Sequence, residues 1–346
     1  MTTGILTIDL GAILRNWEAL RELHAPGEVA AVVKADAYGL GAAQVAPVLA
    51  AAGCRHFFVA TPDEGEALRE VLGEGQMIAV LDGFAGRPHP RLTPVLNSLG
   101  DVRHTRGDAI LHVDTGMNRL GVAGRELDAL AEDPGLTAAL RLRYVMTHLA
   151  AAEDPGHPLN ERQLDAFAAA CARLPRARRS LANSSGIFLG ERFRSELARP
   201  GAALYGINPT PGQDNPMEQV VTLRLPILQV REVPPGGTVG YGGAWLATRP
   251  TRIATVAGGY ADGIPRAWEG QGWGVLHETE VKLAGRVSMD LMGFDVTDAP
   301  RARPGDFIEI LALGQDQDDM AAASGTIGYE ILTRLGRRFR REYVGA

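Results

Sequence analysis

Two lysines stand out in a chain whose other basic residues are all arginines. Of the 35 basic residues, only Lys34 and Lys282 are lysines. An arginine stays protonated and forms no imine, whereas a lysine amine can lose its proton and act as a nucleophile. Lys34 ends the apolar segment 29–34, and partial burial at such a position lowers the pKa of an amine. The sequence therefore predicts a nucleophilic amine here, with a lysine that simply extends to solvent as the alternative.

Two later segments carry groups that suit a phosphate. Asn183, Ser184 and Ser185 precede a glycine, and an Arg-Pro-Gly-Ala segment begins at Arg199. Hydroxyl and backbone N–H groups in such turns can bind anions, although most turns of this composition are only turns. A tyrosine in a Gly-Tyr-Gly-Gly segment, Tyr241, adds a phenol much later in the chain.

These groups need elements to position them, and the first two thirds of the chain predict a barrel. Helical patterns at 41–52, 63–72, 125–132 and 161–174 alternate with continuous apolar runs, as in parallel strands covered on both faces. Eight strands in about 200 residues favour a (β/α)8 TIM-type barrel over residues 1–215. The links 82–91 and 97–108 leave little room for full helices. The expected strands are 29–34, 57–60, 77–81, 92–96, 109–113, 142–147, 180–183 and 202–205.

From residue 220 onward the pattern changes. Short bursts of valine, isoleucine and leucine are separated by Pro-Gly, Gly-Gly and Asp-Gly turns, which indicates a mainly β C-terminal domain over residues 216–346. The segment 208–216, rich in proline, glycine and asparagine, is the expected linker.

The composition excludes several classes of protein. The net charge of −6 gives no basic surface for nucleic acid, and no apolar stretch approaches the ~18 residues of a membrane span. The N-terminal segment lacks a basic region, and two cysteines form neither a disulfide framework nor a metal site. We therefore expect a cytoplasmic enzyme with a small-molecule substrate, no nucleic-acid partner, no membrane association and no metal.

The segment VVKADAYG at 32–39 resembles the cofactor-lysine motif of the alanine racemases, which are fold-type III pyridoxal phosphate enzymes. Further motifs of that family occur in the same order and extend the resemblance from about residue 8 to 335. They are DTGMNRLG at 114–121, TH at 147–148, NSS at 183–185, RPG at 199–201, ALYG at 203–206, VGYG at 239–242, GYADG at 259–263, GRVSMD at 285–290 and GYE at 328–330.

The resemblance implies pyridoxal 5'-phosphate as cofactor and assigns roles by position. The implied cofactor-binding residues are Lys34, Tyr38, His148, Asn183, Ser184, Arg199, Gly201, Ala202 and Tyr329. Lys34 would hold the cofactor as an imine, His148 would stack on its ring and Arg199 would face its pyridine nitrogen. Arg119 and Met289 match substrate-carboxylate positions, and Tyr260 matches a tyrosine that narrows the entrance.

The resemblance also implies interconversion of L- and D-alanine, supplying D-alanine for peptidoglycan. Racemisation needs proton carriers on both faces of the α-carbon, and these would be Lys34 and Tyr241. The family forms homodimers in which the partner subunit supplies this tyrosine, so a homodimer with shared active sites is expected.

One departure concerns the support of Arg119. His112 stands where many alanine racemases have a lysine that becomes carbamylated and orients this arginine. Another anion, such as chloride or a nearby carboxylate, would have to take over. A broad-specificity amino-acid racemase is therefore an alternative, and a non-catalytic pyridoxal-phosphate homeostasis protein is a weaker one because that class lacks a β domain. Fold-type III decarboxylases use a cysteine as the second catalytic group, and neither cysteine lies in the second domain.

Overall fold

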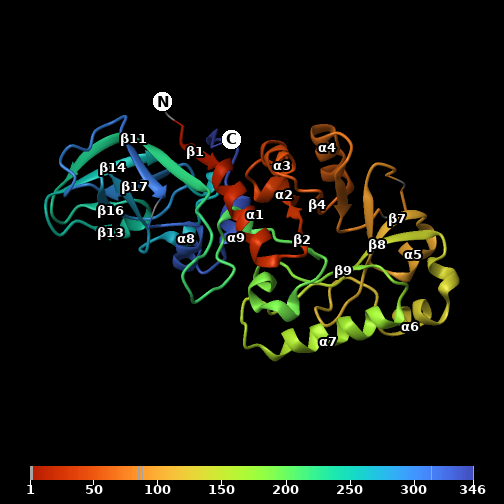
Figure 1. Ribbon diagram of the computed structural model, residues 1–346. Coiled ribbons are helices and arrows are strands. Elements are labelled where there is room, and N and C mark those ends of the chain that lie inside the picture. Colours follow the sequence, from red (N-terminus) through yellow and green to blue (C-terminus); the bar gives the residue numbers. More distant parts are fainter. Residues whose placement is uncertain (1–2, 85, 88, 313, 346) are drawn as a thin grey trace. The chain divides into compact units, whose positions relative to one another are not determined.

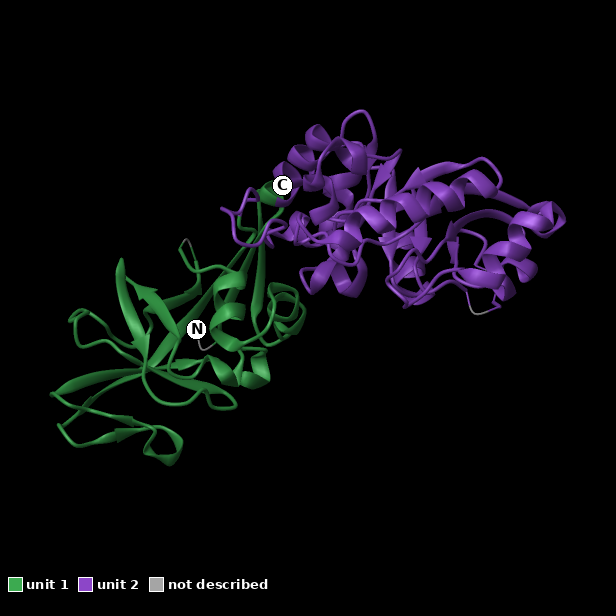
Figure 2. Ribbon diagram, turned by 90° about the horizontal axis from the view of Figure 1, so that it is seen from below, with its two compact units in different colours: residues 1–12, 219–346 green, residues 13–218 purple. Residues whose placement is uncertain are grey.

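The chain forms two compact units (Figure 2). Residues 13–218 make up one, and residues 1–12 together with 219–346 make up the other. The structure is a computed structural model that describes residues 3–84, 86–87, 89–312 and 314–345. In that part of the chain, no helix is long and apolar enough to cross a membrane.

The first unit is a parallel barrel, as the apolar runs predict (Figure 1). Residues 28–32 form one strand, interrupted at Ala30, that pairs with β10 on one side and with β4 on the other. This strand closes the sheet into a barrel. The Ala30 N–H donates to the Ala198 carbonyl at 2.9 Å, which continues the ladder across the interruption. The strands are β2 (Glu28–Val29), β3 (Ala31–Val32), β4 (His56–Val59), β5 (Met77–Val80), β6 (Thr93–Leu96), β7 (Gly107–His112), β8 (Leu140–Met146), β9 (Arg178–Ser180) and β10 (Leu197–Ala198).

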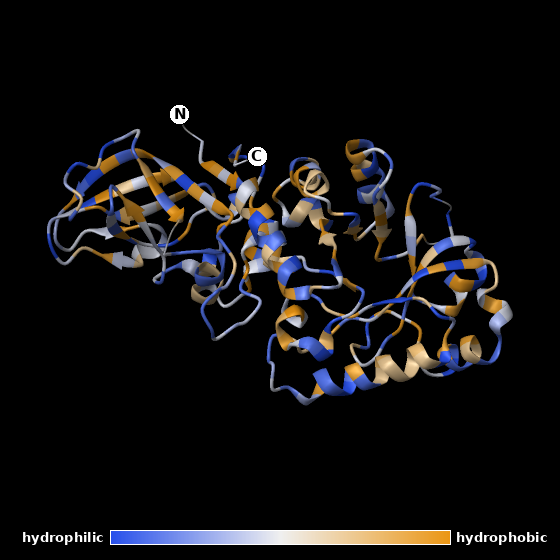
Figure 3. Cartoon of the chain, in the orientation of Figure 1, coloured by the Kyte–Doolittle hydropathy of each residue, from blue (hydrophilic) through white to orange (hydrophobic). Residues whose placement is uncertain are grey.

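Helices connect most of these strands and bury their apolar faces. Hydrophobic and hydrophilic residues are interspersed along these helices (Figure 3). In one buried cluster, Leu111 of β7 and Val145 of β8 pack with Leu130 and Phe167, which lie on two of the helices. The link between β5 and β6 has no helix among its described residues, and the next link has only a short one, as expected. The helices are α1 (Leu10–His24), α2 (Lys34–Tyr38), α3 (Ala42–Ala51), α4 (Pro62–Leu72), α5 (Leu99–His104), α6 (Gly124–Glu132) and α7 (Pro158–Arg173).

The predicted position of the eighth strand, residues 202–205, was wrong. Ala202–Tyr205 is a buried 3-10 turn, η4, and the eighth strand is β10, five residues earlier. All four residues of the turn are buried, so their apolar character reflects burial and not strand structure. This shift puts Arg199 directly after the strand end.

The second unit is mainly β, as expected, and includes the N-terminus. Strand β1 pairs in parallel with β19 and antiparallel with β11, so residues 1–12 belong with the C-terminal sheet and not with the barrel. The expected division at residue 215 therefore misses this contribution, because the partners of β1 lie more than 200 residues away in sequence. The strands are β1 (Ile5–Asp9), β11 (Val221–Val233), β12 (Thr238–Val239), β13 (Trp245–Leu246), β14 (Thr251–Ala257), β15 (Trp273–Leu276), β16 (Thr279–Leu283), β17 (Leu291–Asp295), β18 (Phe307–Leu311) and β19 (Arg340–Val344), with helices α8 (Gln317–Ser324) and α9 (Gly328–Arg334).

Candidate active site

Lys34 begins an unusual turn after the first barrel strand. The four residues that follow it, Ala35–Tyr38, have φ values of 51°, 56°, 53° and 56°, so the turn is left-handed although none of them is glycine. Each such residue costs about 1–2 kcal/mol relative to a right-handed conformation. The surrounding structure must hold this turn in place, and a strained backbone at a nucleophile points to a functional position.

Hydrogen bonds from outside the turn hold it. The Glu64 carboxylate, at the start of α4, accepts from the Ala35 N–H at 2.8 Å and from the Ala60 N–H at 2.7 Å. The Asp36 carboxylate accepts from the Ala42 N–H at 2.7 Å. The backbone of Lys34 is thereby tied to the next strand and helix.

The surroundings of Lys34 favour its neutral amine. Burial lowers the pKa of Lys34, and the positive charge of Arg119 lowers it further, while Asp82 and Glu64 act in the opposite direction. This is the direction that a nucleophile needs. The other lysine, Lys282 on β16, is exposed and paired with Glu280.

Arg199 is a buried cation at the end of β10, only 4% exposed. Its guanidinium donates to the Ser180 hydroxyl and to the Thr147 carbonyl. Burial lowers the pKa of Arg199 to about 10, so it remains charged at neutral pH. A charged arginine donates hydrogen bonds and accepts none.

Two histidines beside these cations are neutral. Burial lowers the pKa of His148 to about 3, and Arg199 and Arg119 add to the effect. Burial likewise lowers the pKa of His112 to about 4. Lys34 and His112 also act on His148, so these residues, predicted from separate motifs, lie close to one another in the barrel unit. The positive charge of this cluster therefore comes from Arg199 and Arg119, and two guanidinium groups suit an anionic ligand.

Ser184 and η4 form a small cradle of polar groups. The Ser184 hydroxyl oxygen accepts from the Gly201 N–H at 3.1 Å and from the Ala203 N–H at 3.2 Å, which leaves its own O–H available as a donor. The Ala202 N–H, in a residue 3% exposed, has no acceptor among the described residues. An orphaned buried N–H is costly unless a ligand satisfies it. These groups therefore fit an anion such as a phosphate.

Tyr38 and Asn183 frame this cradle. A Cβ atom on Gly201 would lie 2.3 Å from the Tyr38 hydroxyl, so only glycine permits this close approach. Asn183 instead supports the turn, because its side chain accepts from the Gly186 N–H at 2.9 Å. The predicted phosphate residues of the barrel unit are thus neighbours.

Arg119 lies in the loop after β7 and is exposed. The Asp114 carboxylate shapes this loop by accepting from the N–H groups of Gly116 and Met117, both at 2.9 Å. Within the described residues, the Arg119 guanidinium has neither a hydrogen-bond partner nor an ion-pair partner. It is free to bind a ligand carboxylate, for which a guanidinium has matching geometry.

The remaining predicted site residues belong to the β unit. Tyr241, Tyr260 and Met289 are 73%, 42% and 54% exposed. The Tyr260 N–H donates to the Ser288 carbonyl at 3.0 Å, which places Tyr260 beside the segment of Met289. Tyr329 lies on α9 of the same unit.

The loop of Tyr241 reaches the same segment. A Cβ atom on Gly240 would lie 3.3 Å from the Arg286 backbone nitrogen, so this glycine allows the two loops to pack. Three loops far apart in sequence therefore present exposed aromatic and apolar side chains together.

Arg338 clamps two of these loops. Its guanidinium donates to both carboxylate oxygens of Asp262, at 2.6 and 2.9 Å, and to Asp290 at 2.7 Å. Asp262 follows Tyr260 by two residues and Asp290 follows Met289. The sequence motifs did not single out Arg338, Glu64 or Ser180. A Thr-x-x-Glu capping signature at Thr61 marks the start of α4 and places Glu64 in its first turn, but nothing local indicates the bond of Glu64 to Ala35.

The fold and site define a class: a parallel barrel with a strand-end lysine and an anion cradle, followed by a β domain with an exposed tyrosine. Comparison with models of known protein families identifies the family within this class. The model for the alanine racemase N-terminal domain matches residues 8–209, and that for the C-terminal domain matches residues 220–343. The chain belongs to the alanine racemase family.

Individual relatives agree along the whole chain. An alanine racemase of Acidiphilium cryptum is 54% identical and covers 99% of both chains, and one of Rhodospirillum rubrum is 49% identical over 99% of this chain and 96% of its own. Among solved structures, the alanine racemase of Bartonella henselae with covalently bound pyridoxal phosphate is 39% identical, with a TM-score of 0.92 over 99% of this chain and 100% of its own.

Proposed function

We propose that this protein is a pyridoxal-phosphate-dependent alanine racemase that interconverts L- and D-alanine with two proton carriers. The observation that carries the proposal is Lys34, an amine at the end of a barrel strand whose pKa is lowered by burial and by the positive charge of Arg119, and which begins a left-handed turn. Family membership over the full chain supports the same activity.

The barrel unit suits the cofactor. The Ser184 hydroxyl and the unpaired Ala202 N–H would bind its phosphate, and Lys34 would attach to it covalently. Arg199 would donate to the ring nitrogen and, because a charged guanidinium cannot accept a hydrogen bond from a protonated ring, would favour the unprotonated nitrogen. When bound, pyridoxal phosphate withdraws electrons from the α-carbon of an amino acid and acidifies its hydrogen.

Two residues of this chain would then move that proton. The Lys34 amine would remove or return the proton on one face of the α-carbon, and the Tyr241 hydroxyl would do so on the other. The exposed Arg119 guanidinium would bind the substrate carboxylate and orient the α-carbon between them. Met289 and Tyr260 would limit the room for the substrate side chain.

A homodimer with shared sites is part of the same proposal. Tyr241, Tyr260 and Met289 are all exposed in the β unit, and an exposed aromatic and apolar cluster is typical of a surface that binds a partner. A partner subunit would cover this surface and receive Tyr241 into its own site. A cytoplasmic location is also proposed, and the two unpaired cysteines, Cys54 and Cys171, suit a reducing compartment.

Borohydride reduction tests the cofactor assignment. Reduction of the purified protein with pyridoxal phosphate should label the peptide that contains Lys34. Lys282 is the matched control because it is the only other lysine in the chain. Label recovered at Lys282 instead would overturn the assignment.

Substrate and subunit arrangement need separate measurements. Loss of optical activity across a panel of free amino acids should be fastest for alanine, and comparable rates for bulkier ones would favour a broad-specificity racemase. Mixing inactive Lys34→Ala and Tyr241→Ala subunits should restore activity, because each heterodimer can form one active site that has both residues. No recovery after verified subunit exchange would mean that one chain supplies both groups.

A further inference from the structure

The orientation of Arg199 depends on few partners. The described residues offer its guanidinium two acceptors, the Thr147 carbonyl and the Ser180 hydroxyl. The first is backbone and is present whatever residue stands there. Ser180 is therefore the side chain that decides where the other arm of the guanidinium points.

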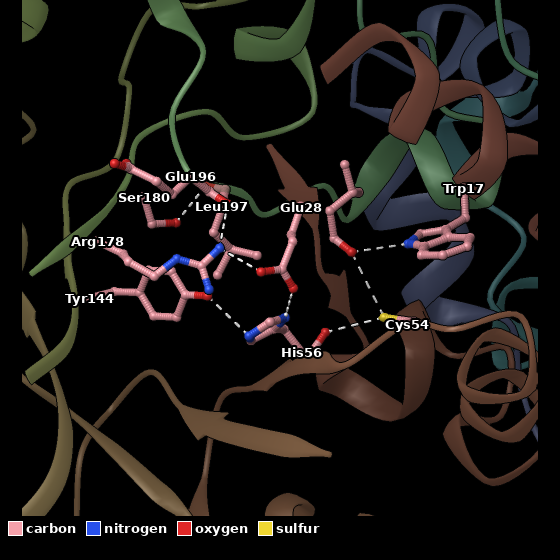
Figure 4. Close-up of polar contacts among 10 residues, drawn as sticks. Trp17, Glu28, Cys54, His56, Tyr144, Arg178, Ser180, Glu196 and Leu197 are labelled. Carbon is pink, nitrogen blue, oxygen red and sulfur yellow. Dashed lines mark hydrogen bonds and ion pairs between the residues drawn. The ribbon is translucent and has the colours of Figure 1, made fainter. Parts of the chain in front are cut away.

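Ser180 is suited to accept because its proton is already in use. The hydroxyl donates to the Leu197 carbonyl at 2.8 Å (Figure 4). A hydroxyl has a single proton, so the oxygen faces Arg199 with its lone pairs. Ser180 is 1% exposed, which leaves little access for water to replace this contact.

The strand that carries Ser180 is anchored at its other end. Arg178, two residues earlier on β9, donates to the Glu28 carboxylate and lies over the Tyr144 ring, 5.1 Å from its centroid (Figure 4). The Tyr144 hydroxyl lies 3.0 Å from His56 Nε2 across the barrel interior, and Glu28 lies 3.3 Å from His56 Nδ1. This network holds the start of β9, so the Ser180 hydroxyl is fixed in position.

We propose that Ser180 is a positioning residue for the reaction, which holds the Arg199 guanidinium in the orientation that faces the cofactor ring. The proposal rests on the proposed function, since it concerns how Arg199 meets pyridoxal phosphate. Without the hydroxyl, one arm of a buried guanidinium has no acceptor in the described part of the chain and turns toward another. The Arg199 guanidinium would then be displaced from the position in which it can donate to the cofactor ring.

Ser180→Ala and Ser195→Ala form a matched pair. The Ser195 hydroxyl donates to the same Leu197 carbonyl, at 3.2 Å, and accepts from the Leu181 N–H at 3.1 Å, but does not bond to Arg199. Both variants lose a hydroxyl bonded to that carbonyl, and both should lower the stability of the cofactor-free protein. Only Ser180→Ala should change the visible absorption and circular dichroism of the bound cofactor.

Kinetics should separate the two variants in the same way. Small displacements of a group in an active site cost up to ~100-fold in rate, so kcat of Ser180→Ala should fall by ~10- to 100-fold. KM for alanine should change by less than about twofold, because Ser180 does not touch the Arg119 loop. Ser195→Ala should keep wild-type kcat and the wild-type cofactor spectrum.

A double-mutant cycle shows whether Ser180 acts through Arg199. In an Arg199→Gln background, Ser180→Ala should cause no further change in the cofactor spectrum, because the two effects share one route. A Ser180→Ala enzyme that matches Ser195→Ala in spectrum and kcat, or spectral effects that add in the double variant, would overturn the inference. A wild-type protein that neither binds pyridoxal phosphate nor racemises alanine would instead overturn the proposed function.

Discussion

The buried ring of His112 should contribute to the acid sensitivity of the protein. His112 is 8% exposed, and its Nδ1–H donates to the Asn97 side-chain carbonyl at 2.8 Å. Burial lowers its pKa from 6.5 to about 4, with Arg199 contributing in the same direction. Between pH 6.5 and pH 4, the unfolded chain therefore binds a proton at His112 and the folded chain does not. The contribution to stability is complete above about pH 6.5 and is lost as the pH falls toward 4.

The magnitude follows from these two values. At pH 5, about 1.5 pH units below the unfolded pKa, the unfolded state gains roughly 2 kcal/mol from protonating this histidine, at about 1.4 kcal/mol per unit. His112→Asn keeps an N–H donor for Asn97 and removes the titration. Between pH 7 and pH 5 the wild type should lose about 2 kcal/mol more unfolding free energy than this variant.

Urea unfolding at both pH values measures this difference. His104→Asn is the control, because it makes the same substitution at a histidine that is exposed on α5. Equal pH dependence of wild type and His112→Asn would refute the reasoning and mean that His112 is not held neutral by burial.

Three further predictions follow. The resemblance to the alanine racemases implies that Lys34 removes the proton of D-alanine and Tyr241 that of L-alanine. Tyr241→Phe should therefore lower racemisation by ~10²–10⁴-fold while solvent deuterium exchange persists for D-alanine and nearly vanishes for L-alanine. Equal loss of exchange for both enantiomers would contradict the two-carrier mechanism. Ala35→Gly should stabilise the protein by roughly 1 kcal/mol in urea unfolding because it relieves a positive φ, whereas Ala50→Gly in α3 should destabilise it by about the same amount; destabilisation by both would argue against the left-handed turn. Arg338→Gln should raise KM for alanine more than it lowers kcat, because Asp262 loses its clamp, and unchanged steady-state kinetics would show that the clamp has no part in substrate binding.

The barrel could be predicted because its signals are local. Continuous apolar runs alternate with amphipathic helical patterns, and both properties are read within a dozen residues. The same reasoning failed at 202–205, where four apolar residues form a buried turn, since an apolar run reports burial and not the backbone conformation. It also failed for β1, whose partners β11 and β19 lie more than 200 residues away in sequence.

The sequence by itself determined which chemical groups are present and in what order: a strand-end lysine, an Asn-Ser-Ser turn, an arginine in an Arg-Pro-Gly segment and a distant tyrosine. These are properties of residue type and of neighbouring residues. Tertiary structure alone decided what each group can do. The left-handed turn after Lys34 is held by Glu64, and Arg199 is oriented by Ser180, through hydrogen bonds between residues 29 and 19 positions apart. The lowered pKa values of Lys34 and His148 arise when the closing barrel removes water from them and brings the arginines near, and no local pattern records that burial.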